Sequence, residues 1–154
     1  MIEYVQVNEE HEYQAAVKLF KEYAEWLNID LSFQHFEDEL KSIKTMYAPP
    51  LGAIVLCKYD NNFVASVAIR PHKEKVAELK RMYVQPNYQG KGIGKKLLML
   101  SIDLAKEMGY QKILLDTLNT MLPAMQLYKS MGFYEVEAYY NNPEKTAVYF
   151  EKII

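Results

Sequence analysis

The stretch from Ala53 to Val84 constrains the fold most, because it consists of three strand-like runs joined only by short turns. The runs cover Ala53 to Tyr59, Phe63 to Arg70 and Val76 to Val84. Asp60-Asn61-Asn62 forms the first connection and Pro71-His72-Lys73 the second, and both contain residues that favour turns. The pattern predicts an antiparallel meander of three strands.

Helix-like and strand-like segments flank this meander. Ile2 to Val7 alternates like a strand, and apolar residues recur at helical spacing from about Glu10 to Leu27. A second helix is predicted from near Ser32, whose hydroxyl would cap it, to just before Pro49-Pro50. Its apolar face would carry Phe33, Phe36, Leu40 and Ile43. Later segments are predicted as helices over Ile93 to Met108 and Leu122 to Met131, and as strands over Ile113 to Thr117, Phe133 to Ala138 and Ala147 to Lys152.

Length and composition indicate one ordinary globular domain over residues 1–154. Apolar residues make up 50% of the chain and charged residues 25%, which excludes a disordered or collagen-like chain. With 18 Lys and Arg against 20 Asp and Glu, the net charge of -2 gives no general attraction to nucleic acid or anionic lipid.

Cysteine usage and the first residues favour a cytoplasmic protein. The lone Cys57 has no partner for an internal disulfide and lies in an apolar run predicted to be a buried strand. Ile2 to Val7 lacks the basic start and the long apolar run of a signal peptide or membrane span. We therefore expect a reducing compartment and no membrane partner.

A glycine-rich segment, Gln89 to Lys96, lies between a predicted strand and a predicted helix. The first N–H groups of a helix have no partner within it, and glycines let a ligand approach the backbone closely. Lysines in the first turn oppose the helix dipole by roughly 0.3 to 1 kcal/mol each unless an anion offsets them. The segment therefore predicts an anion site suited to a pyrophosphate.

Spacing excludes two other phosphate loops. A Walker A loop requires Gly-Lys-Ser/Thr after four residues, but Lys95 stands five positions after Gly90, and Lys96 is followed by Leu97. A Rossmann loop that began at Gly90 would need a third glycine at position 95. Two alternatives stay open: a flexible turn with solubilising lysines, and a nucleotide-binding protein that uses the loop for ATP.

The run Gln89-Gly90-Lys91-Gly92-Ile93-Gly94 resembles the cofactor motif of the GNAT superfamily of acyl-CoA-dependent N-acyltransferases. That motif is Gln or Arg, two residues, Gly, one residue, then Gly or Ala. Leu127 to Phe133 is similar to the late Tyr-x-x-x-Gly-Phe segment of the family. The resemblance covers about Val76 to Phe133, whereas Met1 to Pro50 carries little specific similarity.

The resemblance implies an α/β (α+β) single domain with a mixed, mostly antiparallel sheet of about seven strands and about four helices. Its fourth and fifth strands would splay apart to admit the pantetheine arm of acetyl-CoA, which would pair with the backbone of Met82, Tyr83 and Val84. Backbone amides would hold the pyrophosphate, and Asn119 would contact the cofactor or only form a turn. The amides are those of Gln89, Gly90, Lys91, Gly92, Ile93, Gly94 and Lys95.

Acyl transfer to an amine needs a neutral amine, donors for the oxyanion and an acid for the departing thiolate. The resemblance implies that Tyr128 donates a proton to the CoA sulfur and also contacts the cofactor. Tyr128 belongs as well to an apolar helical stripe, and a buried ring with a hydroxyl in a cleft satisfies both roles. Backbone N–H groups around Tyr83 and Val84 are the predicted oxyanion donors.

Glu78 lies eleven residues before Gln89, at a spacing where some members of the family place a general base. Inside a cleft the pKa of its carboxyl should rise, which suits it to accept a proton directly or through water. The alternative is a strand ion pair between Glu78 and Lys80 or Arg81.

These residues predict an N-acetyltransferase that moves an acetyl group from acetyl-CoA to a primary amine in a ternary complex. The acceptor would be a small molecule, an amino acid derivative or a peptide. The alternative is a non-catalytic acyl-CoA sensor. Cys57 in an apolar strand does not support a covalent mechanism.

Three further expectations concern the acceptor, metals and assembly. The loop with Tyr139 and Tyr140, together with the first two helices, is predicted to shape the acceptor site. No metal site is expected, because the three histidines have no second ligand at metal-binding spacing. An edge strand within Phe133 to Ala138 or Ala147 to Lys152 could pair in a homodimer.

Overall fold

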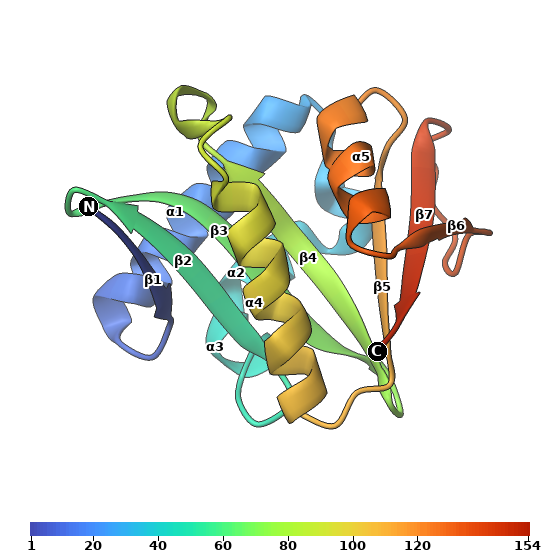
Figure 1. Ribbon diagram of the computed structural model, residues 1–154, viewed down its shortest axis with the longest axis horizontal. Coiled ribbons are helices and arrows are strands. Elements are labelled where there is room, and N and C mark those ends of the chain that lie inside the picture. Colours follow the sequence, from blue (N-terminus) through green and yellow to red (C-terminus); the bar gives the residue numbers. More distant parts are fainter.

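The computed structural model describes residues 1–154, except the side chain of Phe33. It contains one seven-stranded sheet in the order β1-β2-β3-β4-β5-β7-β6 (Figure 1). Among the described residues, only the β4–β5 pair is parallel. The strands are β1 Ile2–Gln6, β2 Ala53–Tyr59, β3 Asn62–Lys73, β4 Val76–Val84, β5 Lys112–Leu118, β6 Tyr134–Val136 and β7 Ala147–Ile153. The mixed, mostly antiparallel sheet predicted from the sequence is confirmed.

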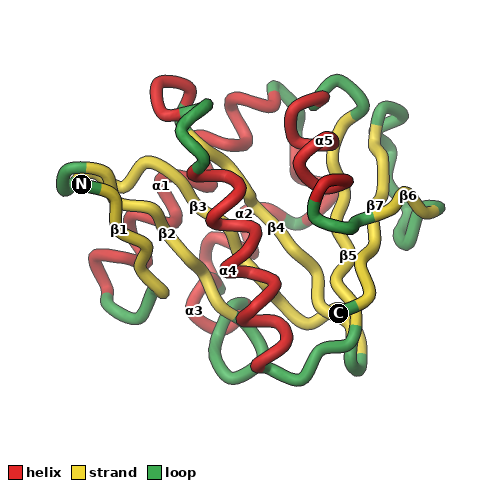
Figure 2. The backbone as a smooth tube through the Cα atoms, viewed as in Figure 1, coloured by secondary structure: helices red, strands yellow, loops and turns green.

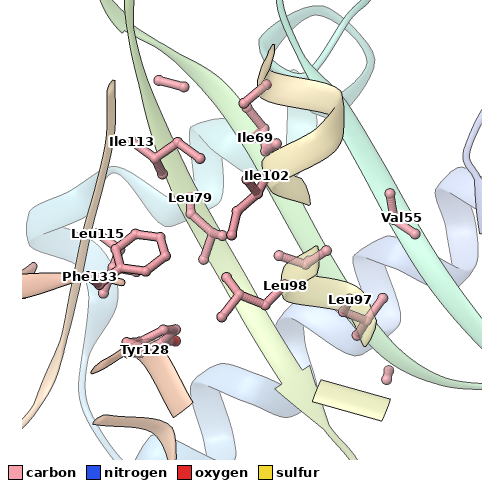
Figure 3. Close-up of a cluster of buried hydrophobic side chains, with 14 of the residues drawn as sticks. Val55, Ile69, Leu79, Leu97, Leu98, Ile102, Ile113, Leu115, Tyr128 and Phe133 are labelled. Atoms are coloured by element: carbon pink, nitrogen blue, oxygen red, sulfur yellow. The ribbon is translucent and has the colours of Figure 1, made fainter. Parts of the chain in front are cut away.

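Helices cover both faces of the sheet (Figure 2). The helices are α1 Glu10–Leu27, α2 Phe36–Lys41, α3 Ile43–Met46, α4 Ile93–Glu107 and α5 Leu122–Ser130, with 3-10 turns at Leu31–Gln34 and Pro86–Tyr88. One core cluster joins α4 and α5 to the sheet, and Leu97, Leu98 and Ile102 of α4 pack against the strands there (Figure 3). A second cluster joins α1 and α3 to the other face. None of the described helices has the length and apolar character needed to span a bilayer.

The predicted meander is present, but its second turn lies later than expected. Asp60 and Asn61 both have positive φ, as the type I′ turn of a tight hairpin requires. Strand β3 continues through the predicted connection to Lys73. Pro71 pairs with Ala77 of β4, and the register shifts directly after this pair. A proline is tolerated in a strand where the ladder is irregular, so Pro71 did not end this one.

The prediction of a single helix from near Ser32 to just before Pro49-Pro50 is wrong, because three short helical segments replace it. His35 has a left-handed backbone with φ of 58°, which a continuous right-handed helix does not accommodate. The cap is also different, since the Asp30 carboxylate accepts the Ser32 N–H at 2.9 Å. The predicted role of Phe33 in the apolar face lies outside the described residues.

A bulge in β4 separates this strand from β5. Ser66 of β3 pairs with Tyr83 and Ala68 with Lys80, so two residues of β4 lie opposite one residue of β3. The extra residue is Arg81, whose φ is 57° and whose carbonyl accepts the Ser66 hydroxyl at 2.9 Å. Strand β4 pairs with β5 only at its start, where residues Val76 to Glu78 lie opposite Lys112 to Leu114. The predicted splay of the fourth and fifth strands is therefore confirmed.

The end of the chain differs slightly from expectation. Strand β6 covers only Tyr134–Val136 instead of Phe133 to Ala138. Strand β7 lies between β5 and β6, so only β6 of the two predicted edge strands is at the edge of the sheet.

Candidate active site

A groove of about 400 Å³, here called the outer groove, opens where β4 and β5 diverge. It is lined by the end of β4, the β4–α4 loop, and parts of α1, α5 and the β5–α5 loop. The structure brings together there ten of the residues predicted to bind the cofactor: Met82, Tyr83, Val84, Gln89, Gly90, Gly92, Ile93, Gly94, Lys95 and Tyr128. The lining does not include Lys91 or Asn119. Asn119 is exposed, and its backbone N–H donates to Thr146 at 2.8 Å.

The β4–α4 loop presents unused backbone donors at the start of α4. The backbone N–H groups of residues 90–95 donate no hydrogen bond to any described residue, and the first bond of the helix runs from the Lys96 N–H to the Gly92 carbonyl. Gly90 and Gly92 have φ of 80° and 82°, a left-handed conformation that other residues adopt at a cost. Because the first turn contains no acidic residue, the helix dipole and these donors favour an anion.

Side chains add positive charge and fix the loop. Lys95 and Lys96 are exposed in the first turn of α4. The Lys91 ammonium lies over the Tyr59 ring, 5.9 Å from its centroid. The Gln89 amide donates to the Val84 carbonyl at 3.0 Å and so ties the loop to the end of β4.

The edge of β4 that faces the splay carries backbone groups for an added strand. Gln85 donates its N–H to Val64 of β3 at 2.9 Å. Because backbone groups alternate between the two edges of a strand, Tyr83 also faces β3, whereas Met82 and Val84 face the open edge. The register therefore favours Met82 and Val84 over Tyr83 for backbone contacts in the groove.

A second space, here called the inner cavity, lies beyond the outer groove and has a volume of about 50 Å³. The two share Tyr23, Met82, Thr117 and Tyr128 in their linings. Besides these shared residues, the polar lining of the inner cavity consists of Gln34, Lys80, Arg81, Asp116, Asn142 and Glu144. Helix α1 and the loop after Tyr140 contribute to this space, and neither Tyr139 nor Tyr140 is in its lining.

Tyr128 occupies the junction of the two spaces. Its ring packs edge-on against Phe133 with centroids 5.9 Å apart, and Figure 3 shows it at the margin of the core. The hydroxyl forms no hydrogen bond with a described residue, although Tyr128 lines both spaces. Burial raises the pKa of Tyr128, so the hydroxyl keeps its proton and acts as a donor.

Glu78 is buried, but its pKa is lowered, so the expected rise is wrong. Burial alone would raise this pKa, yet Lys80, Arg70 and Tyr139 together outweigh it. Arg70 donates to one carboxylate oxygen at 3.0 Å, and the Tyr139 hydroxyl donates to the other at 2.8 Å. The Lys80 ammonium lies 3.7 Å from that second oxygen. The ion-pair alternative for Glu78 is therefore present, and Glu78 does not line the inner cavity.

Arg81 and Glu39 form a buried ion pair under the bulge. The guanidinium donates to both carboxylate oxygens, at 2.9 and 2.7 Å, and each side chain is at most 3% exposed. Burial would raise the pKa of Glu39, but the two-point contact with Arg81 lowers it on balance. The pair holds the unusual backbone of Arg81 in place.

Asp116 on β5 was missed, although a lone acid in an apolar strand run is a visible signal. One of its oxygens accepts the Tyr140 hydroxyl at 2.7 Å. That hydroxyl in turn accepts amide N–H groups from Gln34 at 3.0 Å and Asn142 at 2.9 Å. The loop therefore positions Asp116 beside Tyr128 in the lining of the inner cavity.

Glu9, His11 and Glu12 lie close enough together to suggest a metal site at the start of α1. One Glu12 oxygen already accepts the backbone N–H groups of Asn8 and Glu9. The cluster therefore serves as a helix cap.

Comparisons with known proteins agree with this geometry. The model of the acetyltransferase (GNAT) family matches residues 13–133. An uncharacterized N-acetyltransferase of Schizosaccharomyces pombe is 38% identical over 133 residues, which are 85% of this chain and 82% of that protein.

Solved structures share the fold. An acetyltransferase of the GNAT family from Staphylococcus aureus Mu50 has a TM-score of 0.82 at 21% identity, with 99% of each chain covered. The PaiA N-acetyltransferase of Thermoplasma acidophilum, solved with coenzyme A, has a TM-score of 0.76 at 19% identity, with 100% of this chain and 99% of that chain covered. The chain therefore belongs to the acetyltransferase (GNAT) family and is an acyltransferase.

Proposed function

We propose that this protein transfers an acetyl group from acetyl-CoA to a primary amine by direct attack in a ternary complex. The observation that carries the proposal is the meeting of the outer groove and the inner cavity at Tyr128. One substrate in each space would place the thioester and the amine at this junction. No covalent enzyme intermediate is needed for transfer between two substrates that are bound side by side.

The residues of the outer groove fit acetyl-CoA. The free amides of residues 90–95 suit the pyrophosphate, and the open edge of β4 at Met82 and Val84 suits the amide groups of the pantetheine arm. The structurally similar PaiA N-acetyltransferase was solved with coenzyme A. Lys91 and Asn119 do not line the outer groove, and their contacts with the cofactor stay predictions.

The chemistry then follows from the junction. The amine nitrogen attacks the thioester carbonyl carbon, and N–H groups on the open edge of β4 stabilise the oxyanion. The C–S bond breaks as the oxyanion collapses, and the Tyr128 hydroxyl gives its proton to the sulfur. The amine loses a proton to a carboxylate or to water beside it, so the products are an N-acetylated amine and free CoA.

Two carboxylates compete for the role of base. Glu78 was predicted from the sequence, but Arg70, Lys80 and Tyr139 stabilise its charged form and make it a weaker base. Asp116 lines the inner cavity, and only one of its oxygens accepts a hydrogen bond from the described residues. The contacts therefore favour Asp116, directly or through water, over Glu78.

Binding and transfer are tested in sequence. Calorimetric titration with acetyl-CoA, CoA, ATP with Mg²⁺, and NAD first identifies the ligand of the outer groove. We expect heat with acetyl-CoA and CoA only, because the spacing of the loop excludes the other two motifs. Binding of ATP in place of CoA would overturn the assignment of the groove. Thiol release in a mixture of amines then tests transfer and separates an enzyme from an acyl-CoA sensor.

A further inference from the structure

The Lys80 ammonium is buried in the inner cavity with much of its donor capacity unused. The side chain is 3% exposed, and the ammonium makes one hydrogen bond among the described residues, to the Gln34 carbonyl oxygen at 3.2 Å. An ammonium has three N–H donors. A buried cation of this kind is costly unless a partner neutralises it.

The carboxylates nearest to Lys80 are already committed. Glu39 is held at two points by Arg81, and Glu78 is held by Arg70 and by the Tyr139 hydroxyl. The Lys80 ammonium lies 3.7 Å from Glu78, beyond hydrogen-bond distance. This group of side chains therefore contains three cations, Arg70, Lys80 and Arg81, and two carboxylates. These two carboxylates are bound closely by Arg70 and Arg81, so Lys80 has no carboxylate of a described residue at hydrogen-bond distance.

Asp116 supplies a negative charge to the same cavity from β5. It forms no ion pair with Lys80 or with any other described cation within 4.0 Å. The other acid in the lining, Glu144, uses one oxygen to accept the N–H and hydroxyl groups of Thr146. The cavity therefore has a cation on β4 and a separate anion on β5.

We propose that the acceptor is a small amino acid-like molecule, whose carboxylate pairs with Lys80 while its amine lies beside Asp116. This inference rests on the proposed transfer to an amine and adds the chemical class of the acceptor. A carboxylate at Lys80 would complete the donor set of the ammonium and give it a negatively charged partner at hydrogen-bond distance. The cavity volume of about 50 Å³ favours a small molecule over a peptide chain.

The pKa of Lys80 is lowered, although Glu78 and Asp116 act to raise it. Burial lowers this pKa, and the neighbouring Arg81 lowers it further. An anionic ligand would act in the opposite direction and favour the charged ammonium.

The test compares amino acids with their own carboxamides as acceptors, for example glycine with glycinamide and aspartate with its α-amide. Each pair keeps the amine and removes the charge of the α-carboxylate, and the glycine pair removes the whole negative charge. The assay measures thiol release from acetyl-CoA and N-acetyl product by mass spectrometry, and gives kcat/KM for each member. We expect the acids to be preferred by roughly ten- to hundredfold, the scale of a charge-assisted hydrogen bond.

Lys80→Met should remove this preference through KM of the acids, while the affinity for acetyl-CoA stays the same. Lys58→Met is the matched control, because Lys58 is a partly buried lysine of β2 that lines neither space. A merely structural Lys80 would lower the rates with acids and amides equally.

The outcomes separate the two proposals. Equal rates of the wild-type protein with acids and amides would overturn the carboxylate assignment and leave amine transfer standing. This comparison needs no variant, so it holds even where Lys80→Met does not fold. A preference that survives in Lys80→Met would remove Lys80 from the role. Acetyl-CoA binding without thiol release for any amine would overturn both proposals.

Discussion

Replacement of Tyr128 by Phe isolates the proposed acid. The ring contacts with Phe133 and Phe150, at centroid distances of 5.9 and 6.0 Å, stay possible in the variant. The hydroxyl makes no hydrogen bond with the described residues, so the resting protein loses none. We expect the free energy of unfolding to change by less than about 1 kcal/mol, so Tm should shift by no more than roughly 2 to 4 °C.

Turnover should respond very differently. Loss of a general acid lowers the rate by roughly two to four orders of magnitude, which corresponds to about 2.7 to 5.4 kcal/mol of transition-state stabilisation. The assay is thiol release at saturating acetyl-CoA, with the dissociation constant of acetyl-CoA measured separately by calorimetry. We expect kcat to fall and the dissociation constant to stay within about threefold, because the hydroxyl acts on the departing sulfur.

Tyr23→Phe is the matched control, because Tyr23 lines the same two spaces. We expect this variant to keep its turnover within about tenfold. Wild-type turnover in Tyr128→Phe would refute the assignment, and so would a loss of turnover that merely follows weaker binding of acetyl-CoA. A large loss in Tyr23→Phe alone would transfer the role to Tyr23.

Three further predictions concern the loop, the buried carboxylates and the base. Gly92→Ala and Gly109→Ala both place alanine at a left-handed backbone, with open space around the added carbon, and each should cost roughly 1 to 2 kcal/mol in urea unfolding. Only Gly92→Ala should weaken acetyl-CoA binding in calorimetry, and equal affinities would contradict the loop assignment. Because the pKa values of Glu39 and Glu78 are lowered in the folded protein, their stabilisation is complete above the ordinary value of 4.5 and is lost as pH falls through the folded values. In the Glu39→Gln variant, the free energy of unfolding should fall less steeply from pH 7 to pH 3, by on the order of one titrating group. An unchanged slope would contradict the role of Glu39 in acid sensitivity. Asp116→Asn should lower kcat more than Glu78→Gln at neutral pH, and the reverse order would return the role of base to Glu78.

Local patterns predicted the regular parts of this fold well. The apolar spacing of α1 and the runs of β2 and β4 gave their bounds, because each element has a long and uninterrupted period. The glycine loop was predictable because conformation and donor supply are both local properties of the chain. The splay of β4 and β5 came from the family resemblance, since the bulge at Arg81 depends on pairing with β3.

The failures lie where tertiary contacts decide the structure. The break at His35 brings Gln34 and Glu39 to Arg81, a partner far along the chain that no local pattern reveals. The pKa of Glu78 was predicted in the wrong direction, because burial was considered without Arg70 and Tyr139, which approach from other elements. Asp116 stands out in the sequence as an acid in an apolar strand run, but its place in the inner cavity depends on the distant Tyr140 loop.

The most direct test of the central claim is the stoichiometry of acetyl transfer from acetyl-CoA to a pool of primary amines. Free thiol and N-acetylated amine are measured together, by colorimetry and mass spectrometry, with the purified protein. The account predicts one N-acetylated product for each thiol released, at a rate far above the uncatalysed reaction. Acetyl-CoA binding without thiol release for any amine would contradict it and would identify the outer groove as that of an acyl-CoA sensor.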